Sequence, residues 1–450
     1  MTEEIINALV QVTGLHVAAR TSVFALKGKG HDLQTIAGKL NVRTVLEGSV
    51  RKAGNRIRVT AQLVNASDGQ HLWAERFDRE VADVFAIQDE IALNIVGKLK
   101  INLLGEEKKL VLKRHTENLE AHSWYLKGRH FFRQATTEGM QKALGAYQRA
   151  IESDPTYAPA FAALAYTYVW MTAAWLALPA SETMPKARTA AQQALALEPT
   201  LPEAHVSLAL VATFYDWNLP GAERAFNEAL RLNPNYAEAH GWYTAPLIWL
   251  DTRFAEALDH GRHAVDLNPV DPWARFQLCW THYFGRDFEG AIAQARQLIN
   301  LDPLWGSGHY VLGVALVTAG RAAKALASIQ RAIELDGRVV HCIAWLGLSY
   351  AIAGKNDEAL GCLAELETHE REGRSVAAWK LVVHAGLRDS DAVMRCLNEA
   401  FDEHSASLVF HLTHPLVDSL RMTPRFLDLL RRMGLEHLAT YLPKTAWKPR

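Results

Sequence analysis

The sequence predicts a mostly α-helical chain, in which an α-α superhelix of repeated helix pairs follows a small α/β domain. Two observations support this prediction. Small and apolar residues recur at a step of 34 residues between Glu238 and Thr368, whereas before residue 100 apolar and polar residues alternate in short stretches bounded by turns. The chain has 450 residues, too many for one hydrophobic core, so two or more domains are expected.

The 34-residue step is visible in three columns of residues. The first column consists of alanines, the second of small residues and the third of apolar residues: Ala257, Ala291, Ala325 and Ala359; Ala245, Cys279, Gly313 and Gly347; Ala264, Leu298, Ala332 and Leu366. Small residues in register predict helices that meet at the same close contacts in every repeat. These columns, and repeat ends such as Leu267-Asn268-Pro269 and Leu301-Asp302-Pro303, resemble the tetratricopeptide repeat, a helix-turn-helix unit that stacks into a solenoid.

Similar features continue on both sides of the regular stretch. Three earlier units end near Pro155, Pro199 and Pro234, and a degenerate unit follows at about Ser375 to His404. We therefore expect about eight repeats over residues 119–405 and capping helices over residues 406–450, because a solenoid needs a last helix that is polar outside. Residues 101–118 are charged and lack apolar periodicity, which predicts a linker.

Residues 1–100 predict a separate α/β domain. Ile57, Val59, Ala61 and Leu63 alternate with polar residues, which is typical of a strand with one buried face. The expected elements, in order, are a helix at Glu3–Val12, a strand within His16–Phe24, a helix at Asp32–Leu40 with Asp32 as N-cap, strands at Val42–Val50, Ile57–Leu63 and Gln70–Phe77, and a helix at Phe85–Leu99.

This domain resembles the TolB-amino-terminal-like domain found beside tetratricopeptide repeats in bacterial signalling proteins. The resemblance rests on LEGSVRKAGNRIRVTAQLVNASDGQHLWAERFDRE (Leu46–Glu80) and FAIQDEIALNIV (Phe85–Val96). It implies a system built around a class III adenylate or guanylate cyclase domain, or, in other relatives, a DNA-binding domain. The family has a strand of the type DIAVLPF before its first helix, and this chain begins after that point. A miscalled start codon, a fragment of a larger gene, or another strand in the gap would explain this, and we favour the first two.

Composition limits the classes of function. The chain is 49% hydrophobic and 22% charged, and its formal net charge of −1 offers no electrostatic attraction to nucleic acid or to an anionic membrane. No run approaches the ~18 apolar residues of a membrane span, and the acidic start is not a signal peptide. We expect a cytoplasmic chain with no nucleic-acid partner and no membrane segment, while homo-oligomerisation and the compartment of any longer protein stay open.

No constellation of residues predicts catalysis. The phosphate-loop, nucleophile-elbow and H-E-x-x-H motifs are absent, and Lys27-Gly28-Lys29-Gly30 lacks the setting of a phosphate cradle. The scattered cysteines Cys279, Cys342, Cys362 and Cys396 predict reduced thiols at small helix-packing positions. We therefore expect no enzyme activity, no catalytic residue and no cofactor.

Several histidines and basic residues could form binding sites, but each has a simpler interpretation as part of the protein surface. His260 and His263 are three apart on a predicted helix, but no third ligand is visible nearby, so we interpret them as surface histidines and expect no metal. The same interpretation applies to His404, His411 and His414. Arg51, Lys52, Arg56 and Arg58 form a basic hairpin face that nearby acidic residues would neutralise.

The first helix of each repeat lines the concave side of a solenoid. The inward positions include Tyr166, Trp170, Trp242, Trp249, Phe276, Trp280, Tyr283 and Tyr310. One interpretation is a groove in which these aromatic residues anchor a peptide or a partner helix. The other is that a tight superhelix packs the rings on one another or on the C-terminal tail. The carboxylate-clamp subfamily has Lys and Asn at positions that here hold Val206, Leu210, Trp242, Pro246, Phe276 and Trp280, which argues against that mode.

The sequence therefore favours a non-catalytic protein-interaction and regulatory module of a bacterial signalling system. Two alternatives follow from the resemblance. The chain is either the regulatory C-terminal half of a class III adenylate cyclase whose catalytic domain lies elsewhere, or the effector half of a transcription regulator.

Overall fold

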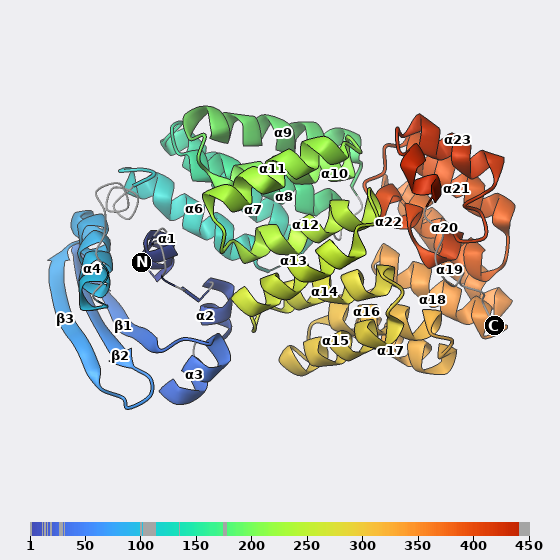
Figure 1. Cartoon of the computed structure of the whole chain (residues 1–450). Coiled ribbons are helices and arrows are strands. Elements are labelled where there is room, and N and C mark those ends of the chain that lie inside the picture. Colours follow the sequence, from blue (N-terminus) through green and yellow to red (C-terminus); the bar gives the residue numbers. More distant parts are fainter. Residues whose placement is uncertain are drawn as a thin grey trace. The chain divides into compact units, whose positions relative to one another are not determined.

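The computed structural model describes residues 2–10, 12, 15, 17–18, 20–26, 30, 32–99, 101, 114–134, 136–173 and 178–440. The chain divides into two compact units (Figure 1). The first contains Met1–Leu119 and Val265–Asp271, and the second contains Glu120–Ala264 and Pro272–Arg450. The first unit carries a small sheet with helices and the second is helical, so the predicted fold class is confirmed.

The sheet of the first unit is antiparallel, with the strand order β1-β2-β3. The elements of this unit are α1 (Thr2–Val10), α2 (Arg20–Leu26), α3 (Leu33–Leu40), β1 (Thr44–Ala53), β2 (Arg56–Asn65), β3 (His71–Glu80), η1 (Val81–Asp83) and α4 (Val84–Lys98). In β2, Ile57, Val59, Ala61 and Leu63 are buried, as the alternation predicted. They pack against the buried side of α4, and α1 joins the same core. The three described strands are contiguous, so no gap lies between them.

Local details of this unit follow from its sequence. The Asp32 carboxylate accepts a hydrogen bond from the Thr35 amide at 2.7 Å, which confirms the predicted N-cap of α3. Asp78 accepts hydrogen bonds from Arg56 and Arg58, so an acidic residue does offset part of the basic hairpin face. The two guanidinium groups lower the pKa of Asp78 to about 2.

One predicted element is wrong. The sequence favoured a strand within His16–Phe24, but Arg20–Leu26 is the helix α2. The side chains of Ser22 and Leu26, one helical turn apart, are both buried, and α2 packs against α3. A stretch this short carries too few apolar residues to separate a strand from a helix by period alone. Lys27-Gly28-Lys29 and most of the predicted linker lie outside the described residues.

Successive helix pairs build the second unit. The described pairs are α6 (Leu119–Phe132) with α7 (Thr137–Ser153), α8 (Ala158–Ala173) with α9 (Ala180–Leu197), α10 (Pro202–Phe214) with α11 (Leu219–Leu232), α12 (Ala237–Trp249) with α13 (Phe254–Leu267), α14 (Pro272–Phe284) with α15 (Phe288–Leu301), α16 (Gly306–Thr318) with α17 (Ala322–Asp336), α18 (Val340–Ile352) with α19 (Asn356–Arg371), and α20 (Ala377–Gly386) with α21 (Ser390–Asp402). The first helices of neighbouring pairs contact one another from α10 to α20, which makes them one continuous side of the solenoid. We call this side the inner surface.

The 34-residue columns lie at the contacts between these helices. Ala257, Ala291, Ala325 and Ala359 are fully buried. A Cβ atom added to Gly313 would lie 2.5 Å from the Ile329 Cδ1 atom, so a larger residue there would require the Ile329 side chain to shift. The four cysteines are free and buried at such contacts, as predicted.

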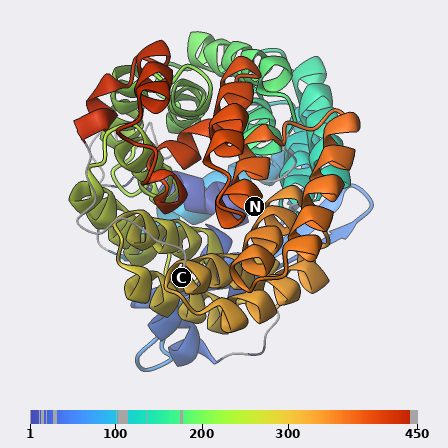
Figure 2. The ribbon, with the colours of Figure 1, turned by 90° about the vertical axis from the view of Figure 1, so that its right-hand side faces the viewer.

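The last elements are α22 (Leu408–Leu412), η2 (Pro415–Val417), α23 (Pro424–Arg432) and η3 (Glu436–Thr440). They do not simply cap the solenoid. The loop after α10 meets the loop after α21, where Trp217 stacks on Phe401 and on His404 with ring centroids 5.4 and 4.5 Å apart. Figure 2 shows the C-terminal helices (orange to red) beside the green helices of this earlier repeat. The superhelix therefore closes on itself within the second unit.

Among the described residues, no helix combines the length and the apolar character needed to cross a membrane.

Candidate functional site

The eight predicted groove residues all lie on first helices of their pairs, but few are open to solvent. Trp170, Trp242, Trp249, Phe276, Trp280, Tyr283 and Tyr310 are buried, with exposed fractions of 9% or less, and Tyr166 is half-buried. The structure divides these residues between two environments. One is a strip of aromatic rings that runs along the first helices of five pairs, and the other is a region beneath the C-terminal elements.

The aromatic strip consists of Phe132, Tyr166, Trp170, Trp242, Trp273, Phe276 and Trp305. Each ring contacts the next, with centroid separations between 4.5 Å for Trp170 and Trp273 and 6.1 Å for Tyr166 and Trp170. Phe132, Tyr166, Trp273 and Trp305 are half-buried, so one edge of the strip reaches solvent. Tilted and edge-to-face contacts at these distances are favourable and hold the rings rigid.

A chain of hydrogen bonds crosses the strip. The Trp242 Nε1–H donates to the Tyr166 hydroxyl at 2.7 Å, and that hydroxyl donates to the Glu238 carboxylate. The Tyr236 hydroxyl donates to the other Glu238 oxygen at 3.3 Å. Burial raises the pKa of Glu238 above its ordinary value, while the two hydroxyl donors oppose that shift. The Arg129 guanidinium also lowers the pKa of Glu238, so the strip combines apolar rings with one carboxyl group that is held by two hydroxyls and acted on by one cation.

The second environment lies under α22 and η2, residues 408–417, which we call the inner segment. The Phe410 ring contacts Trp249, Trp280 and Phe284, with centroids 5.0 to 5.5 Å apart. The His414 ring contacts Tyr283 and Trp345. The inner segment therefore covers three predicted groove residues: Trp249, Trp280 and Tyr283. Tyr310 lies next to Trp280 and His341.

Buried polar groups hold the inner segment in place. Asp418 is fully buried and accepts hydrogen bonds from Arg286 at 2.8 Å and from Arg421 at 3.0 Å. Arg421 also donates to the carbonyl oxygen of Leu412 at 2.9 Å. His414 Nδ1 accepts from the Leu416 amide, which leaves Nε2 as the donor to the Tyr283 hydroxyl at 3.1 Å. Each of these groups fixes the segment to an earlier helix or to its own turn.

The prediction that His411 and His414 are surface residues is wrong. Both imidazoles have no exposed surface, because the closing superhelix presses the inner segment, which carries them, against the first helices. Burial lowers the pKa of His411 to about 3 and lowers the pKa of His414 well below its ordinary value. His404 is partly exposed and stacks on Trp217.

His260 and His263 do have a third histidine beside them. His240 on α12 has its Nδ1 atom 2.8 Å from Nδ1 of His260, and its ring centroid lies 4.5 Å from that of His263. The sequence interpretation missed His240 because it lies on the preceding helix. A signal existed in the repeat pattern, because the two helices of one pair pack against each other and His240 lies on the helix that pairs with α13.

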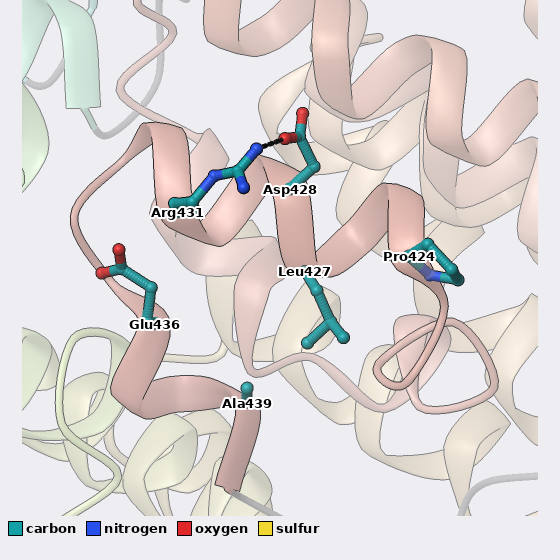
Figure 3. Close-up of a pocket in the computed structure, with 6 residues that line it drawn as sticks. All are labelled: Pro424, Leu427, Asp428, Arg431, Glu436 and Ala439. Carbon is teal, nitrogen blue, oxygen red and sulfur yellow. Dashed lines mark hydrogen bonds and ion pairs between the residues drawn. The ribbon is translucent and has the colours of Figure 1, made fainter.

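A surface pocket of about 360 Å³ lies between α23 and η3. Figure 3 shows its lining: Pro424, Leu427, Asp428, Arg431, Glu436 and Ala439. Arg431 points toward Asp428 and forms an ion pair with it, so these two charges already satisfy one another. The pocket offers no nucleophile and no paired carboxyl groups for acid-base chemistry.

Elsewhere, the described residues form neither a cluster of metal ligands nor a site with a reactive thiol. No three histidine, cysteine, aspartate or glutamate side chains among them stand arranged to hold a metal ion. Burial raises the pKa of Cys362 to about 11 and that of Cys396 to about 12, and it raises the pKa of Cys279 and Cys342 further. Thiols held protonated in this way are poor nucleophiles.

Sequence reasoning missed Phe132, Trp273 and Trp305. Trp273 lies in the first turn of α14 and Trp305 immediately precedes α16, whereas counting inward from the alanine columns selects positions in the middle of each first helix. The signal that could have found Trp273 and Trp305 is an aromatic residue at the start of a first helix, where Tyr236 lies in α12; Phe132, the last residue of α6, carries no such signal.

Comparisons with known proteins agree with this architecture. Residues 277–338 match the model of the Tetratricopeptide repeat family, within the regular 34-residue stretch. A protein of Rhizobium meliloti (strain 1021), provisionally named adenylate cyclase 3, is 36% identical over 220 residues, which are 48% of this chain and 36% of that protein. The chain thus spans about a third of the length of this relative.

Solved structures with similar repeats were also found. A tetratricopeptide repeat protein from Parabacteroides merdae covers 60% of this chain and 99% of its own length, with 14% identity and a TM-score of 0.42. YrrB, described as a TPR protein with an unusual peptide-binding site, covers 43% of this chain and 93% of its own length, with 22% identity and a TM-score of 0.29.

Proposed function

We propose that this chain is a non-catalytic module of a bacterial signalling system that binds a protein partner on its inner surface. The observation that supports this most is the aromatic strip, whose exposed edge is formed by Phe132, Tyr166, Trp273 and Trp305. Rigid aromatic side chains with one face open are the residue types that dominate binding energy at protein interfaces. They cost little conformational entropy when a partner orders them, because their neighbours already fix the rings.

The occupant that fits this strip is a peptide or helix with apolar anchors and a basic side chain. The rings provide contact area for the anchors, and the Glu238 carboxyl group lies beside them, hydrogen-bonded to Tyr166. Arg129 already favours the charged form of this carboxyl group, and a basic side chain of the partner would add to that effect and would meet the faces of nearby indole rings. Of the four remaining predicted groove residues, Trp249, Trp280 and Tyr283 are covered by the inner segment, and Tyr310 is buried beside Trp280. We therefore assign the partner to the strip alone.

The test uses variants that remove exposed rings and spare buried ones. Peptides are selected from a displayed library against the full chain, and their affinity is measured by fluorescence anisotropy. Trp273→Ala combined with Trp305→Ala should weaken binding by about 10³-fold, because two hot-spot aromatics at about 2 kcal/mol each contribute about 4 kcal/mol. Trp124→Ala is the matched control, because Trp124 is half-buried on α6 and lies outside the strip, between Lys127 and Arg149.

Three outcomes would contradict the proposal: no peptide is enriched, the double variant binds as tightly as the wild type, or the control loses as much affinity as the double variant. Circular dichroism of each variant checks that the helical content is intact.

A second candidate is a regulatory region that acts on a class III nucleotide cyclase. The Rhizobium meliloti relative, named as an adenylate cyclase, supports it, and so does the α/β unit, which we infer to be TolB-like from its three-stranded sheet and covering helix α4. In this function the chain is cytoplasmic and converts no ATP itself. Adding it to a purified cyclase domain from the same genome should change the rate of cyclic AMP formation. An unchanged rate would reject the regulatory role, and cyclic AMP made by the chain alone would reject its non-catalytic character.

A further inference from the structure

We propose that residues 441–450 of this chain, which we call the terminal peptide, bind the aromatic strip and compete there with the protein partner. This inference rests on the proposed function and adds a regulator to the same surface. The terminal peptide lies outside the described residues, and the described chain that precedes it ends at Thr440 in η3.

The terminal peptide has the composition that the strip requires of an occupant. Its sequence is YLPKTAWKPR, which offers the apolar anchors Tyr441, Leu442 and Trp447 and the cations Lys444, Lys448 and Arg450. Trp, Tyr and Arg are the residue types that dominate the hot spots of protein interfaces. Proline at positions 443 and 449 restricts the backbone, so less conformational entropy is lost when the peptide binds.

Charge favours the same pairing. Taking the three cations of the terminal peptide, which has no acidic residue, from the chain's formal net charge of −1 leaves −4 on the other 440 residues. On the strip, Glu238 is within electrostatic range of one cation, Arg129, and of a second acid, the exposed Glu203. A lysine or arginine of the terminal peptide would therefore meet an excess of carboxyl groups beside the rings, and its side chain could lie over an indole face.

The described chain ends close enough to the strip for this contact. The His437 ring in η3 is hydrogen-bonded at 2.5 Å to the carbonyl oxygen of Leu250, the C-cap of α12. Trp242 of the strip lies about eight residues earlier in that helix, which is about 12 Å at 1.5 Å per residue. Trp447 follows His437 by about ten residues, and an extended chain of that length spans about 33 Å. Since η3 and the strip belong to the same compact unit, the contact requires no movement of one unit against the other.

One other surface lies near the start of the terminal peptide, namely the pocket between α23 and η3. Its lining contains no aromatic residue, and its Arg431 would repel the cations of the peptide. Asp428 in the same pocket is already paired with Arg431. The strip instead offers rings for Trp447 and carboxyl groups for the lysines, so the pocket is the alternative that the experiment must exclude.

Attachment makes even a weak contact effective. A short flexible connection gives the peptide an effective concentration of about 1 mM at the strip. If the free peptide binds with a Kd of about 100 μM, the covered form of the strip outnumbers the uncovered form by about ten to one. The apparent affinity of the partner is then about tenfold lower than its intrinsic affinity for the uncovered strip.

The first experiment uses variants of the full chain that change only the terminal peptide. The affinity of a strip-binding peptide from the displayed library is measured by fluorescence anisotropy. Trp447→Ala should raise this affinity by about tenfold, because it removes the main anchor of the competitor. Lys444→Glu combined with Lys448→Glu should act in the same direction. Thr445→Ala is the matched control and should bind as the wild type does.

The second experiment supplies the terminal peptide as a separate molecule. A fluorescein-labelled peptide of sequence YLPKTAWKPR is titrated with the Trp447→Ala chain, in which the strip is uncovered. It should bind with a Kd of about 100 μM, and Trp273→Ala combined with Trp305→Ala in the same chain should abolish this binding. Leu427→Ala, in the pocket between α23 and η3, should leave the binding unchanged.

Three results would overturn the inference: equal affinity of the library peptide for the wild type and Trp447→Ala, unchanged binding of the labelled peptide by the strip double variant, or loss of that binding in Leu427→Ala. A library peptide that binds the strip equally well in every variant of the terminal peptide would leave the proposed function intact and reject only this inference. If the library yields no strip-binding peptide, the proposed function fails, and the labelled peptide still decides whether the strip holds this segment.

Discussion

Lowering the pH should loosen the second unit through its buried histidines, and His411 offers the sharpest test. Its ring is fully buried on the inner segment, among Trp379, Phe410 and His414, and neither ring nitrogen has a hydrogen-bond partner in the described part of the chain. Burial lowers its pKa from an ordinary 6.5 to about 3. The unfolded chain therefore takes up a proton first as the pH falls. The contribution of His411 to stability is complete above pH 6.5 and is lost progressively between pH 6.5 and about pH 3.

The magnitude follows from these two pKa values. Between pH 7 and pH 5 the free energy of unfolding should fall by about 2 kcal/mol for this one group. His411→Phe removes the titrating group and keeps a ring of similar size. The loss of stability between the two pH values should therefore be about 2 kcal/mol smaller in the variant than in the wild type. Any change in packing acts equally at both pH values and cancels in this difference.

Urea unfolding at pH 7 and pH 5, followed by circular dichroism, measures the effect. Val409→Ala is the control, because it removes buried volume from the same helix without a titrating group, and should lower stability equally at both pH values. If the wild type and His411→Phe lose the same stability between pH 7 and pH 5, the imidazole is not held neutral by burial and the argument fails.

Two further changes test the packing of the repeats and of the inner segment. Gly347→Ala should lower the free energy of unfolding by about 1–3 kcal/mol, because an added Cβ would lie 2.9 Å from Val383 and 3.0 Å from the Cβ atom of Cys362. Gly361→Ala should instead raise it by about 0.5–1 kcal/mol, because Gly361 lies on an exposed helix face with no atom within 4 Å of the added Cβ. Asp418→Asn should cost about 3–5 kcal/mol in urea unfolding, because it leaves the buried guanidinium groups of Arg286 and Arg421 without their carboxylate; a loss below 1 kcal/mol would show that water reaches this pair.

The sequence predicted those features that depend on neighbours in the chain. The alanine and glycine columns report contacts between helices of one pair or of adjacent pairs, and the structure buries Ala291 and places Gly313 in close contact with Ile329. Alternation in β2 likewise reports a single buried face of one sheet. In each case the packing partner lies within a few tens of residues, so the pattern of the sequence carries the information.

Closure of the superhelix could not be predicted in this way. The contacts of Phe410 with Trp249 and Trp280 join segments far apart in the chain, and no period links them. They result from the accumulated rotation of the stacked pairs, which small changes in each crossing angle alter. The same gap explains the mistaken placement of His411 and His414 at the surface. It also explains why the sequence left open whether the inner aromatic rings face a partner or the chain's own tail.

The chain's own tail covers the aromatic rings beneath the inner segment, whereas the edge of the aromatic strip stays uncovered among the described residues. Leu408, Val409 and Leu412 of the inner segment are fully buried, and burial of such side chains contributes about 1.5–3 kcal/mol each. A partner that displaced the segment would have to replace about 5–9 kcal/mol from these three residues and the buried pairing of Asp418 as well. This cost of displacing the segment is close to the binding free energy of a micromolar complex, about 8 kcal/mol. A partner of that affinity would therefore retain almost no net binding free energy after displacing the segment. The edge of the aromatic strip carries no such cost, because Trp273 and Trp305 are already half-exposed. We therefore propose that a partner binds to the strip, where recognition does not require the solenoid to open.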